Sequence, residues 1–286
     1  MKNEKCYLCG NIEFENVEGK LRDLPDIKIL RCKNCGLVFL ESFDHINDNF
    51  YEDSKMIPDK TKHEWETHLK DCEDDDIRRS RFISKMCSGK SILDFGCGGG
   101  GFLLKIKDSC SKCDGLEKDR AFVKIMTEQG FKIYNDIDEL TEKYDIITLF
   151  HVLEHLKDPK DMLNKLSKHL NSGGQIIIEV PQSNDALLSM YKCKAFTEFT
   201  YWGCHLFLFN NFTLNKVIQD AGLNVDYIKN IQRYPLSNHL YWISHGKPGG
   251  HVKWDFLDSP ETTKAYEAQL AKKEMCDTLI ACVSVK

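Results

Sequence analysis

The chain has 286 residues, of which 42% are hydrophobic and 29% charged, enough for a full α/β core and one small extra module. Its net charge of −5 argues against extended contact with nucleic acid phosphates, and no apolar run reaches the roughly 20 residues of a membrane span. Thirteen cysteines without a secretory signal favour a reducing compartment, so we expect a cytoplasmic protein with no membrane or nucleic acid partner.

Two matched cysteine pairs stand near the N-terminus, 22 residues apart. Each pair has two residues between its cysteines and a glycine directly after it; the cysteines are Cys6, Cys9, Cys32 and Cys35. A tetrahedral zinc ion takes four thiolates from two tight turns of this kind, and four protein ligands leave no position open for a substrate. The spacing predicts a small structural zinc-binding module over residues 1–40, with surface cysteines or a redox pair as the alternative.

Residues 41–90 form a predicted linker and helical arm between this module and the rest of the chain. The charged stretch from Lys62 to Cys87 carries a loose apolar stripe, which predicts one or two helices with a break near Glu73–Asp76. We expect this arm to pack at the edge of a sheet or over a pocket.

Residues 91–286 alternate between apolar runs typical of strands and amphipathic runs typical of helices. Strands are predicted at Ser91–Asp94, Cys113–Glu117, Phe131–Tyr134, Tyr144–Phe150, Gln175–Val180, Asn224–Ile231 and Thr278–Val285. Helices are predicted at Phe102–Lys107, Arg120–Gln129, Pro159–Leu170, Thr213–Ala221 and Thr263–Met275. This order predicts a Rossmann-like, doubly wound α/β sheet of seven strands, preceded by the zinc-binding module.

The string ILDFGCGGGGF, residues 92–102, describes a strand, a turn too tight for side chains and the start of a helix. Glycines let a nucleotide-type cofactor approach the backbone, but both a dinucleotide and other cofactors suit this turn. Three further positions follow the first three strands. Asp94 ends the first strand, Glu117 ends the second, where an acid can accept both ribose hydroxyls, and Asp136 with Ile137 suits an adenine ring.

Together these segments resemble class I S-adenosylmethionine (SAM) methyltransferases over about residues 80–285. LDFGCGGG is similar to the family's first motif, GLEKD to its ribose-binding segment, YDIITLFHVLEHLKDP to its fourth strand and the residues after it, and GGQIIIEVP to its fifth strand. The resemblance implies SAM as the cofactor, bound by Asp94, Gly96, Cys97, Gly98, Glu117, Lys118, Asp136, Ile137 and His151.

A zinc module joined to such a domain resembles methyltransferases that act on sugars and related metabolites. Phe50 and Tyr51 fit this group, because aromatic residues before the domain often close over the ligand. The resemblance implies a small-molecule acceptor, and the leading hypothesis is O-methylation of a sugar, a nucleotide-sugar or a phosphorylated precursor of a surface polysaccharide. An RNA methyltransferase, N- or C-methylation of a small metabolite, and a non-catalytic SAM-binding protein are the alternatives.

Candidate catalytic residues follow the fourth and fifth strands, where active sites of such sheets lie. Glu154 and His155 resemble an acid–base pair of the family, and His155 is the first candidate for the general base. His205 is the second candidate; either histidine has a packing role as its alternative. Tyr201 is a candidate for the lining of the acceptor pocket.

The segment from Pro235 to His251 is predicted to be a loop, rich in histidine and glycine. A cation beside a glycine turn suits a phosphate or carboxylate, so His239 and Lys247 are candidate substrate ligands. A solvated surface loop is the alternative interpretation.

Overall fold

The computed structural model describes residues 2–47, 49–52 and 61–286. Its main sheet has seven strands in the order β10-β11-β8-β7-β4-β5-β6, which confirms the predicted Rossmann-like α/β fold. The strands are β4 (Ser91–Phe95), β5 (Lys112–Leu116), β6 (Ile133–Tyr134), β7 (Tyr144–Phe150), β8 (Leu170–Pro181), β10 (Leu223–Ile231) and β11 (Thr278–Val285). β4 to β8 pair in parallel, and β11 joins β8 and β10 in antiparallel register.

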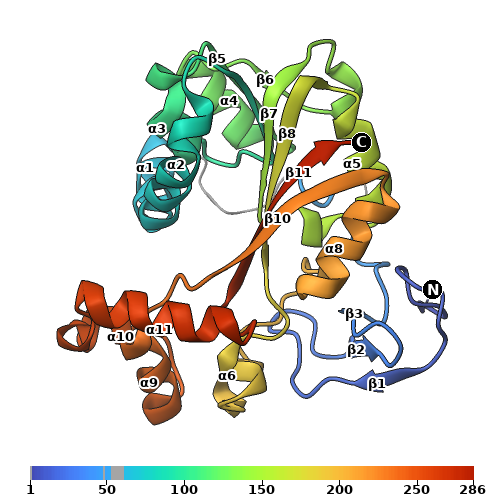
Figure 1. Ribbon diagram of the computed structural model, residues 1–286, viewed down its shortest axis with the longest axis vertical. Coiled ribbons are helices and arrows are strands. Elements are labelled where there is room, and N and C mark those ends of the chain that lie inside the picture. The colour runs from blue at the N-terminus through green and yellow to red at the C-terminus, as the bar shows by residue number, and fades with distance from the viewer. Residues whose placement is uncertain (1, 48, 53–60) are drawn as a thin grey trace.

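Helices cover both faces of this sheet (Figure 1). One side carries α1 (Lys62–Asp71), α2 (Glu73–Cys87), α3 (Gly101–Ile106) and α4 (Arg120–Glu128), and the other side carries α5 (Pro159–Ser167) and α8 (Asn211–Asp220). The short η1 (Lys107–Ser109) follows α3, and η2 (Ile137–Glu139) follows β6. The two helices predicted over Lys62–Cys87 are therefore present, but the break lies at Cys72 and Glu73–Asp76 form the first turn of α2.

Neighbouring residues of the central strands point to opposite faces of the sheet, as strand geometry requires. Ile92, Ile146 and Ile177 belong to the core under α2, α3 and α4, whereas Leu93 and Ile147 belong to the core under α5 and α8. Because both faces are covered, β7 is almost wholly apolar, which made this strand easy to predict.

The chain order of the strands reverses between β4 and β7. From β4 the chain moves outward to β5 and β6, then returns to place β7 on the other side of β4. In open parallel sheets a crevice forms at the carboxyl ends of the two strands where the order reverses, and ligands bind there. The glycine turn follows β4 and His151 follows β7, so the fold brings both to this crevice.

The N-terminal module forms a second sheet with a strand from the far end of the chain. β1 (Phe14–Asn16), β2 (Ile29–Cys32) and β3 (Val38–Leu40) are antiparallel, and β9 (Phe207–Leu208) pairs with β3. Buried residues of the module, including Leu8 and Phe39, share one continuous core with Leu149 of β7. The module is thus tied to a later segment of the chain by the hydrogen bonds of β9 and to the main sheet by packing.

The predicted loop over residues 235–251 is wrong. Most of it is helical, in α9 (Leu236–His245) and the start of α10 (Gly250–Lys253), which pack with η4 (Asp255–Leu257) and α11 (Pro260–Lys272). Tyr241 and Trp242 give α9 a buried face, and Asn238 Oδ1 accepts hydrogen bonds from the amides of Gly249 and Gly250, each at 3.2 Å. The glycines therefore bring α10 against α9 instead of opening a loop.

Two smaller differences concern the fifth strand and its neighbours. The predicted helix over Pro159–Leu170 ends at Ser167. The residues directly after Leu170 lie within β8, where the pairing with β7 is irregular. Two short helices, α6 (Ala186–Ser189) and α7 (Lys194–Thr197), follow β8, and η3 (Leu153–His155) follows β7.

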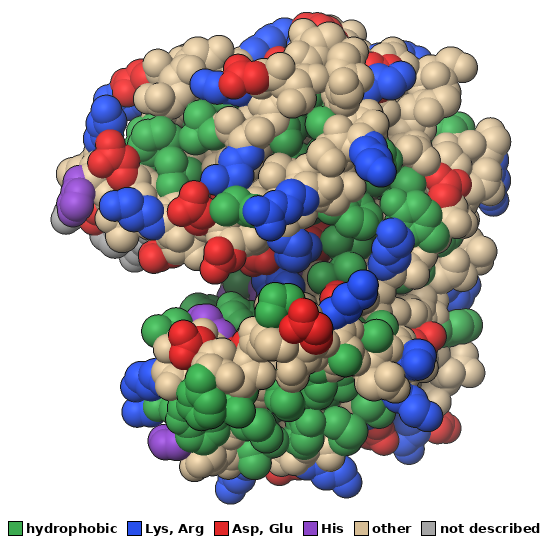
Figure 2. Space-filling model, turned by 60° about the vertical axis from the view of Figure 1, so that its left-hand side comes forward, with side chains coloured by type: hydrophobic (Ala, Val, Ile, Leu, Met, Phe, Trp, Pro, Cys, Tyr) green, Lys and Arg blue, Asp and Glu red, His purple; other side chains and the backbone are tan. Residues whose placement is uncertain are grey.

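The molecule is deeply hollowed on one side (Figure 2). Above the hollow lies the sheet with α1 to α4, and below it lie the C-terminal helices α9 to α11, as comparison with Figure 1 indicates. Among the described residues, no helix is both long and apolar enough to span a bilayer.

Candidate functional site

The four cysteines of the N-terminal module converge on one point. Their sulfur atoms all lie within 4.8 Å of one another, with Cys6 Sγ 3.6 Å from Cys35 Sγ and Cys9 Sγ 3.5 Å from Cys32 Sγ. Each pair lies on a tight turn, because the amides of the following glycines donate to the carbonyl oxygens of Cys6 and Cys32, each at 2.9 Å. All four thiols are free, and a tetrahedral Zn–S₄ site needs sulfur atoms about 3.8 Å apart. The cluster therefore fits a zinc ion.

The glycine turn after β4 has a backbone that side chains would strain. Gly96, Gly98 and Gly100 all have positive φ, at 77°, 51° and 75°. A Cβ on Gly96 would lie 2.5 Å from Val152, and one on Gly100 would lie 1.9 Å from Met126. A Cβ on Gly98 would meet no atom within 4 Å, so the turn opens to free space at this residue.

Helix α1 covers part of the same turn. Trp65 Nε1 donates to the carbonyl oxygen of Gly99 at 2.8 Å, and a Cβ on Gly99 would lie 2.8 Å from the ring of His68. The predicted arm therefore packs against the turn, and sequence reasoning had not assigned these contacts to Trp65 or His68.

Glu117, which follows β5, meets the glycine turn. Its carboxylate accepts hydrogen bonds from the amides of Gly98 at 2.7 Å, Lys118 at 2.7 Å and Asp119 at 2.8 Å. Burial raises the pKa of Glu117, although these amides oppose the shift. Two predicted cofactor residues, 19 positions apart, thus lie in direct contact.

The residues predicted to contact an adenine lie beside this pair. Asp136 caps η2, accepts a hydrogen bond from the amide of Asp138 at 3.1 Å and forms an ion pair with Lys118, whose hydrogen bond lowers the pKa of Asp136. Ile137 is buried, at 8% exposure.

Asp94 and Cys97 lie deeper in the crevice. Thr148 Oγ1 donates to Asp94 Oδ1 at 2.6 Å, and burial raises the pKa of Asp94 to about 7 despite this hydrogen bond. The amide of Cys97 donates to Leu116 O at 3.1 Å, and its sulfur packs where a side chain on Gly115 would otherwise lie. Cys97 therefore fixes the turn to β5.

A cluster of charged side chains lies at the ends of β7 and β8; we call it the strand-end cluster, and its members are Arg78, Arg79, His151, Glu154 and Glu179. His151 has a positive φ of 55°, and its ring nitrogens lie 3.2 Å from Glu154 Oε1 and 3.2 Å from Glu179 Oε1. Burial alone would lower the pKa of His151, but these two hydrogen bonds outweigh it and raise the pKa.

Glu179 is the centre of this cluster and was missed by sequence reasoning. Its buried carboxylate accepts from Arg78 Nη1 at 2.8 Å and from Arg79 Nη2 at 2.7 Å. Burial favours a high pKa for Glu179, but His151 and the two arginines hold the pKa well below its usual value. The signal was present, because Glu179 is a lone acid in the apolar run IIIEV of β8.

His155 and His205, the candidate bases, lie side by side. Their ring centroids are 4.9 Å apart, and Tyr51 Oη lies 3.4 Å from His155 Nδ1. Burial lowers the pKa of His155, and burial together with the neighbouring His155 lowers the pKa of His205 to about 4. Both imidazoles are therefore neutral near pH 7, the state in which a histidine can accept a proton.

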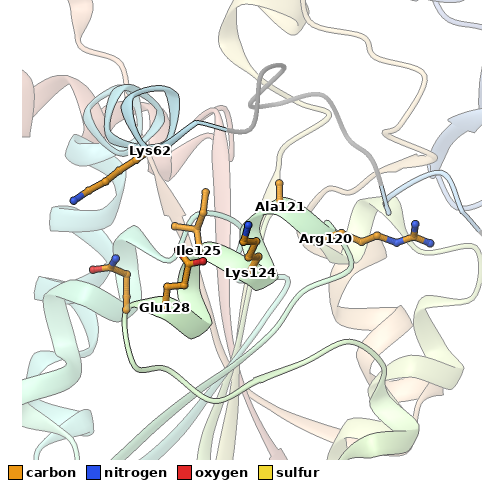
Figure 3. Close-up of a pocket in the computed structure, with 7 residues that line it drawn as sticks. Lys62, Arg120, Ala121, Lys124, Ile125 and Glu128 are labelled. Carbon is orange, nitrogen blue, oxygen red and sulfur yellow. The ribbon is translucent and has the colours of Figure 1, made fainter.

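The remaining candidate residues lie elsewhere. Tyr201 is buried and lines a cavity of about 610 Å³, together with Arg31, Lys192 and Lys194. His239 is buried within the C-terminal helices, where its ring contacts Tyr266 Oη at 2.7 Å and Gln232 Nε2 at 3.2 Å; Lys247 is exposed just after α9. A second cavity of about 290 Å³ lies against α4 and α1, and no predicted site residue lines it (Figure 3).

Residues 65–228 match the family model described as a methyltransferase domain. Ubiquinone biosynthesis O-methyltransferase of Pseudomonas putida (strain GB-1) is 25% identical over 197 residues, which cover 62% of this chain and 85% of that protein. A SAM-dependent methyltransferase structure from Thermotoga maritima has a TM-score of 0.50 at 15% identity and covers 78% of this chain and 95% of that one. A Haloferax volcanii complex that contains the Trm112 methyltransferase activator gives the same TM-score and identity, with 77% and 94% coverage.

Proposed function

Because the chain belongs to the methyltransferase domain family and is a SAM-dependent methyltransferase, we propose that it methylates an oxygen of a small acceptor. The proposed acceptor is a sugar, a nucleotide-sugar or a phosphorylated precursor of a surface polysaccharide. The observation that carries the proposal is the neutral histidine pair, His155 and His205, beyond the carboxyl end of β7. A hydroxyl must lose its proton during methylation, and an imidazole in this state accepts one.

The glycine turn and the acids beside it are proposed to hold SAM, which supplies an electrophilic methyl group. Gly96, Cys97 and Gly98 would lie against it with their backbone, and the open space at Gly98 supports this placement. Glu117 and Lys118 would receive the ribose, and Asp136 with Ile137 the adenine. Asp94 and His151 lie at the inner end of the crevice, where a buried carboxyl and an imidazole with a raised pKa suit the amino acid end.

The proton is proposed to pass from the acceptor hydroxyl to His155, with His205 as the second candidate. Glu154 lies beside the pair, with Oε1 3.9 Å from His155 Nε2, and would stabilise the imidazolium that forms. Burial alone would raise the pKa of Glu154, but His151 holds it below its usual value, so the carboxylate carries the needed negative charge.

One observation supports an oxygen acceptor. The P. putida relative is named as an O-methyltransferase, which favours oxygen over nitrogen or carbon. The cavity beside Tyr201 is lined by Arg31, Lys192 and Lys194 as well as Glu18 and Glu274, and neither His155 nor His205 lines it. The substrate roles of Tyr201, His239 and Lys247 therefore stay predictions.

The domain boundaries and the zinc ion are proposed as well: a zinc-binding module over residues 1–40, a linker and helical arm over 41–90 and the SAM domain over 91–286. Zinc would be held by all four cysteines of the N-terminal cluster, and it would fix the turns from which β2 and β3 extend.

The direct test measures methyl transfer from SAM to nucleotide-sugars, sugar phosphates and phenolic acceptors. We expect transfer to a hydroxyl of a sugar-containing acceptor. His155→Ala should lower kcat by 10²- to 10⁴-fold and leave the Kd for SAM within about threefold of wild type. The matched control is His169→Ala, since His169 precedes β8 and so lies at the opposite end of the strands from His155. Full activity of His155→Ala would refute the base assignment, and transfer only to amines would refute the acceptor class.

A further inference from the structure

We infer that a second metal site lies at the carboxyl ends of the parallel strands, formed by His155, Cys204 and His205. One ligand atom from each residue, an imidazole nitrogen or the thiol sulfur, lies within 4.8 Å of the other two. Around tetrahedral zinc, nitrogen and sulfur ligands stand about 3.3 to 3.8 Å apart. Small side-chain rotations therefore suffice to bring the three atoms onto one ion.

The backbone that carries these side chains is held in place from several sides. The amide of Gly203 donates to Asp23 Oδ1 at 2.8 Å, and the carbonyl oxygen of Gly203 lies 2.6 Å from His45 Nε2. On the other side of the site, the amide of His155 donates to Val152 O at 3.0 Å. Metal binding is favoured when surrounding contacts fix the positions of the ligands, and these hydrogen bonds hold the backbone at or next to the three residues.

A buried carboxylate lies beside the three residues, and one of its two oxygen atoms accepts no hydrogen bond from the residues that the structure describes. Glu154 is fully buried; its Oε1 contacts His151 Nδ1 at 3.2 Å and lies 3.9 Å from His155 Nε2. Its Oε2 is buried with no hydrogen-bond partner in the described part of the chain. A buried oxygen in this state is costly, and a nearby cation would offset that cost. Carboxylates next to metal-bound histidines are also a common arrangement.

The donor set identifies the class of ion. Two imidazoles and a thiolate suit zinc and its transition-metal neighbours, whereas magnesium and calcium prefer oxygen ligands. The four-cysteine cluster offers zinc a closed shell, but three ligands leave a fourth position open. The two clusters thus predict two ions with different accessibility in one chain.

The open fourth position suggests a role for the ion in methyl transfer. This role, unlike the metal site itself, rests on the proposed function. An acceptor hydroxyl bound to a zinc ion loses its proton at a much lower pH than in water. His155 and His205 would then act as metal ligands in place of the base role proposed above, and the proton of the bound hydroxyl would pass to solvent. The metal site itself is inferred only from the side chains and stands without any methyl transfer.

The test compares metal content in full-length variants. Protein produced with added zinc and passed over a chelating resin is analysed by mass spectrometry for bound metal. We expect two zinc ions per chain in the wild type and one in both His205→Ala and the double variant Cys204→Ala/His205→Ala. The control Cys110→Ala removes a half-buried cysteine outside both clusters and should retain two. Equal zinc content in wild type and both variants would overturn the inference.

A spectroscopic measurement covers the case in which the variants fail to fold. Wild type whose four-cysteine cluster is filled with zinc is titrated with Co²⁺ alone. A thiolate-to-cobalt absorption band that saturates at one equivalent supports the site, and a flat spectrum overturns it. Methyl transfer by a wild type that holds one zinc ion would refute the metal site but not the proposed function. Two bound zinc ions without methyl transfer to any acceptor would refute the proposed function but not the metal site.

Discussion

The four-cysteine cluster and the strand-end cluster are both compact sets of polar side chains, but the chain builds them differently. The cysteines come from two short turns joined by the β1–β2 hairpin, so three spacings in the sequence define the whole set. The strand-end cluster joins α2 to the ends of β7 and β8, and Arg78 lies 101 positions from Glu179. The four-cysteine cluster can therefore be predicted from the sequence, whereas the members of the strand-end cluster come together only in the folded sheet.

The two clusters also differ in how their charge is balanced. Glu179 faces Arg78, Arg79 and His151 at 3.2 Å or less, so the chain itself supplies the opposite charges. The cysteine cluster holds four thiols and, among the described residues, no cation within its ligand set. Its stability should therefore depend on an ion from solution, and that of the strand-end cluster on the integrity of its own pairs.

The largest expected effect comes from breaking the cysteine cluster. Cys32→Ser should remove the zinc ion and destabilise the protein by several kcal/mol, because metal binding to such clusters is coupled to folding. The loss should reach beyond the module, since β3 pairs with β9 and both lie in the shared core. Metal analysis and thermal unfolding measure the effect, and Cys110→Ser is the control. Unchanged zinc content and Tm in Cys32→Ser would remove the distinction between the clusters.

Features that depend on local sequence patterns were predicted, as the four-cysteine cluster was. β7 was predicted to the residue, because both faces of this strand are covered and the run is almost wholly apolar. Glu117 was predicted at the end of the second strand and directly follows β5, because its position along the chain is a local property; its contact with Gly98 was not predicted. α9 was missed because its histidines and the glycines after it suggested a loop, while Tyr241 and Trp242 supplied the buried face.

Other parts of the site depend on tertiary contacts that no local pattern encodes. Nothing in the spacing of Arg79 and Glu179 indicates that they meet, and the approach of Cys204 to His155 depends on the pairing of β9 with β3. A lone acid in an apolar strand is the one local signal that would have identified the strand-end cluster.

The next largest effect should come from Glu179→Gln. The amide keeps the shape of the side chain but removes the buried charge that Arg78 and Arg79 share. In the described part of the chain, Arg78 then keeps Asp75 and Arg79 keeps Asp76 as an ion-pair partner. Breaking a buried ion pair on one side costs about 3–5 kcal/mol, which urea unfolding would measure. Glu142→Gln is the control, because Glu142 pairs with Lys112 and Lys132 at the surface and its loss should change the free energy of unfolding little. Equal effects in the two variants would show that the strand-end cluster is no more than a set of surface pairs.

A smaller, pH-dependent effect is expected for Asp94. Burial raises the pKa of Asp94 from 3.8 to about 7, so the folded state takes up a proton in this range. Protonated Asp94 therefore makes its full contribution to the free energy of unfolding below pH 4, and this contribution is lost as the pH rises toward 7. Asp94→Asn cannot ionise, so the free energy of unfolding of wild type relative to this variant should fall by about 1–2 kcal/mol between pH 5 and pH 7.

The control for this measurement is Asp108→Asn, which replaces an exposed acid and should keep the pH dependence of the wild type. A cation next to a carboxyl favours its charged form, so SAM should lower the pKa of Asp94 if its amino acid end lies there. Calorimetry at pH 6.5 in buffers of different ionisation enthalpy would then detect proton release on SAM binding, absent in Asp94→Asn. Proton release of equal size in both would place SAM away from Asp94.

The smallest expected effects separate the two kinds of turn. Gly10, after the first cysteine pair, and Gly98, in the glycine turn, both have positive φ and open space where a Cβ would lie. Alanine at either position should cost only the backbone strain, about 1 kcal/mol in the free energy of unfolding. Gly98→Ala should also weaken SAM binding by tenfold or more, because its methyl group enters the space proposed for the ligand, whereas Gly10→Ala should leave the Kd unchanged. Equal Kd values for SAM in both variants would mean that the opening at Gly98 is not where SAM binds.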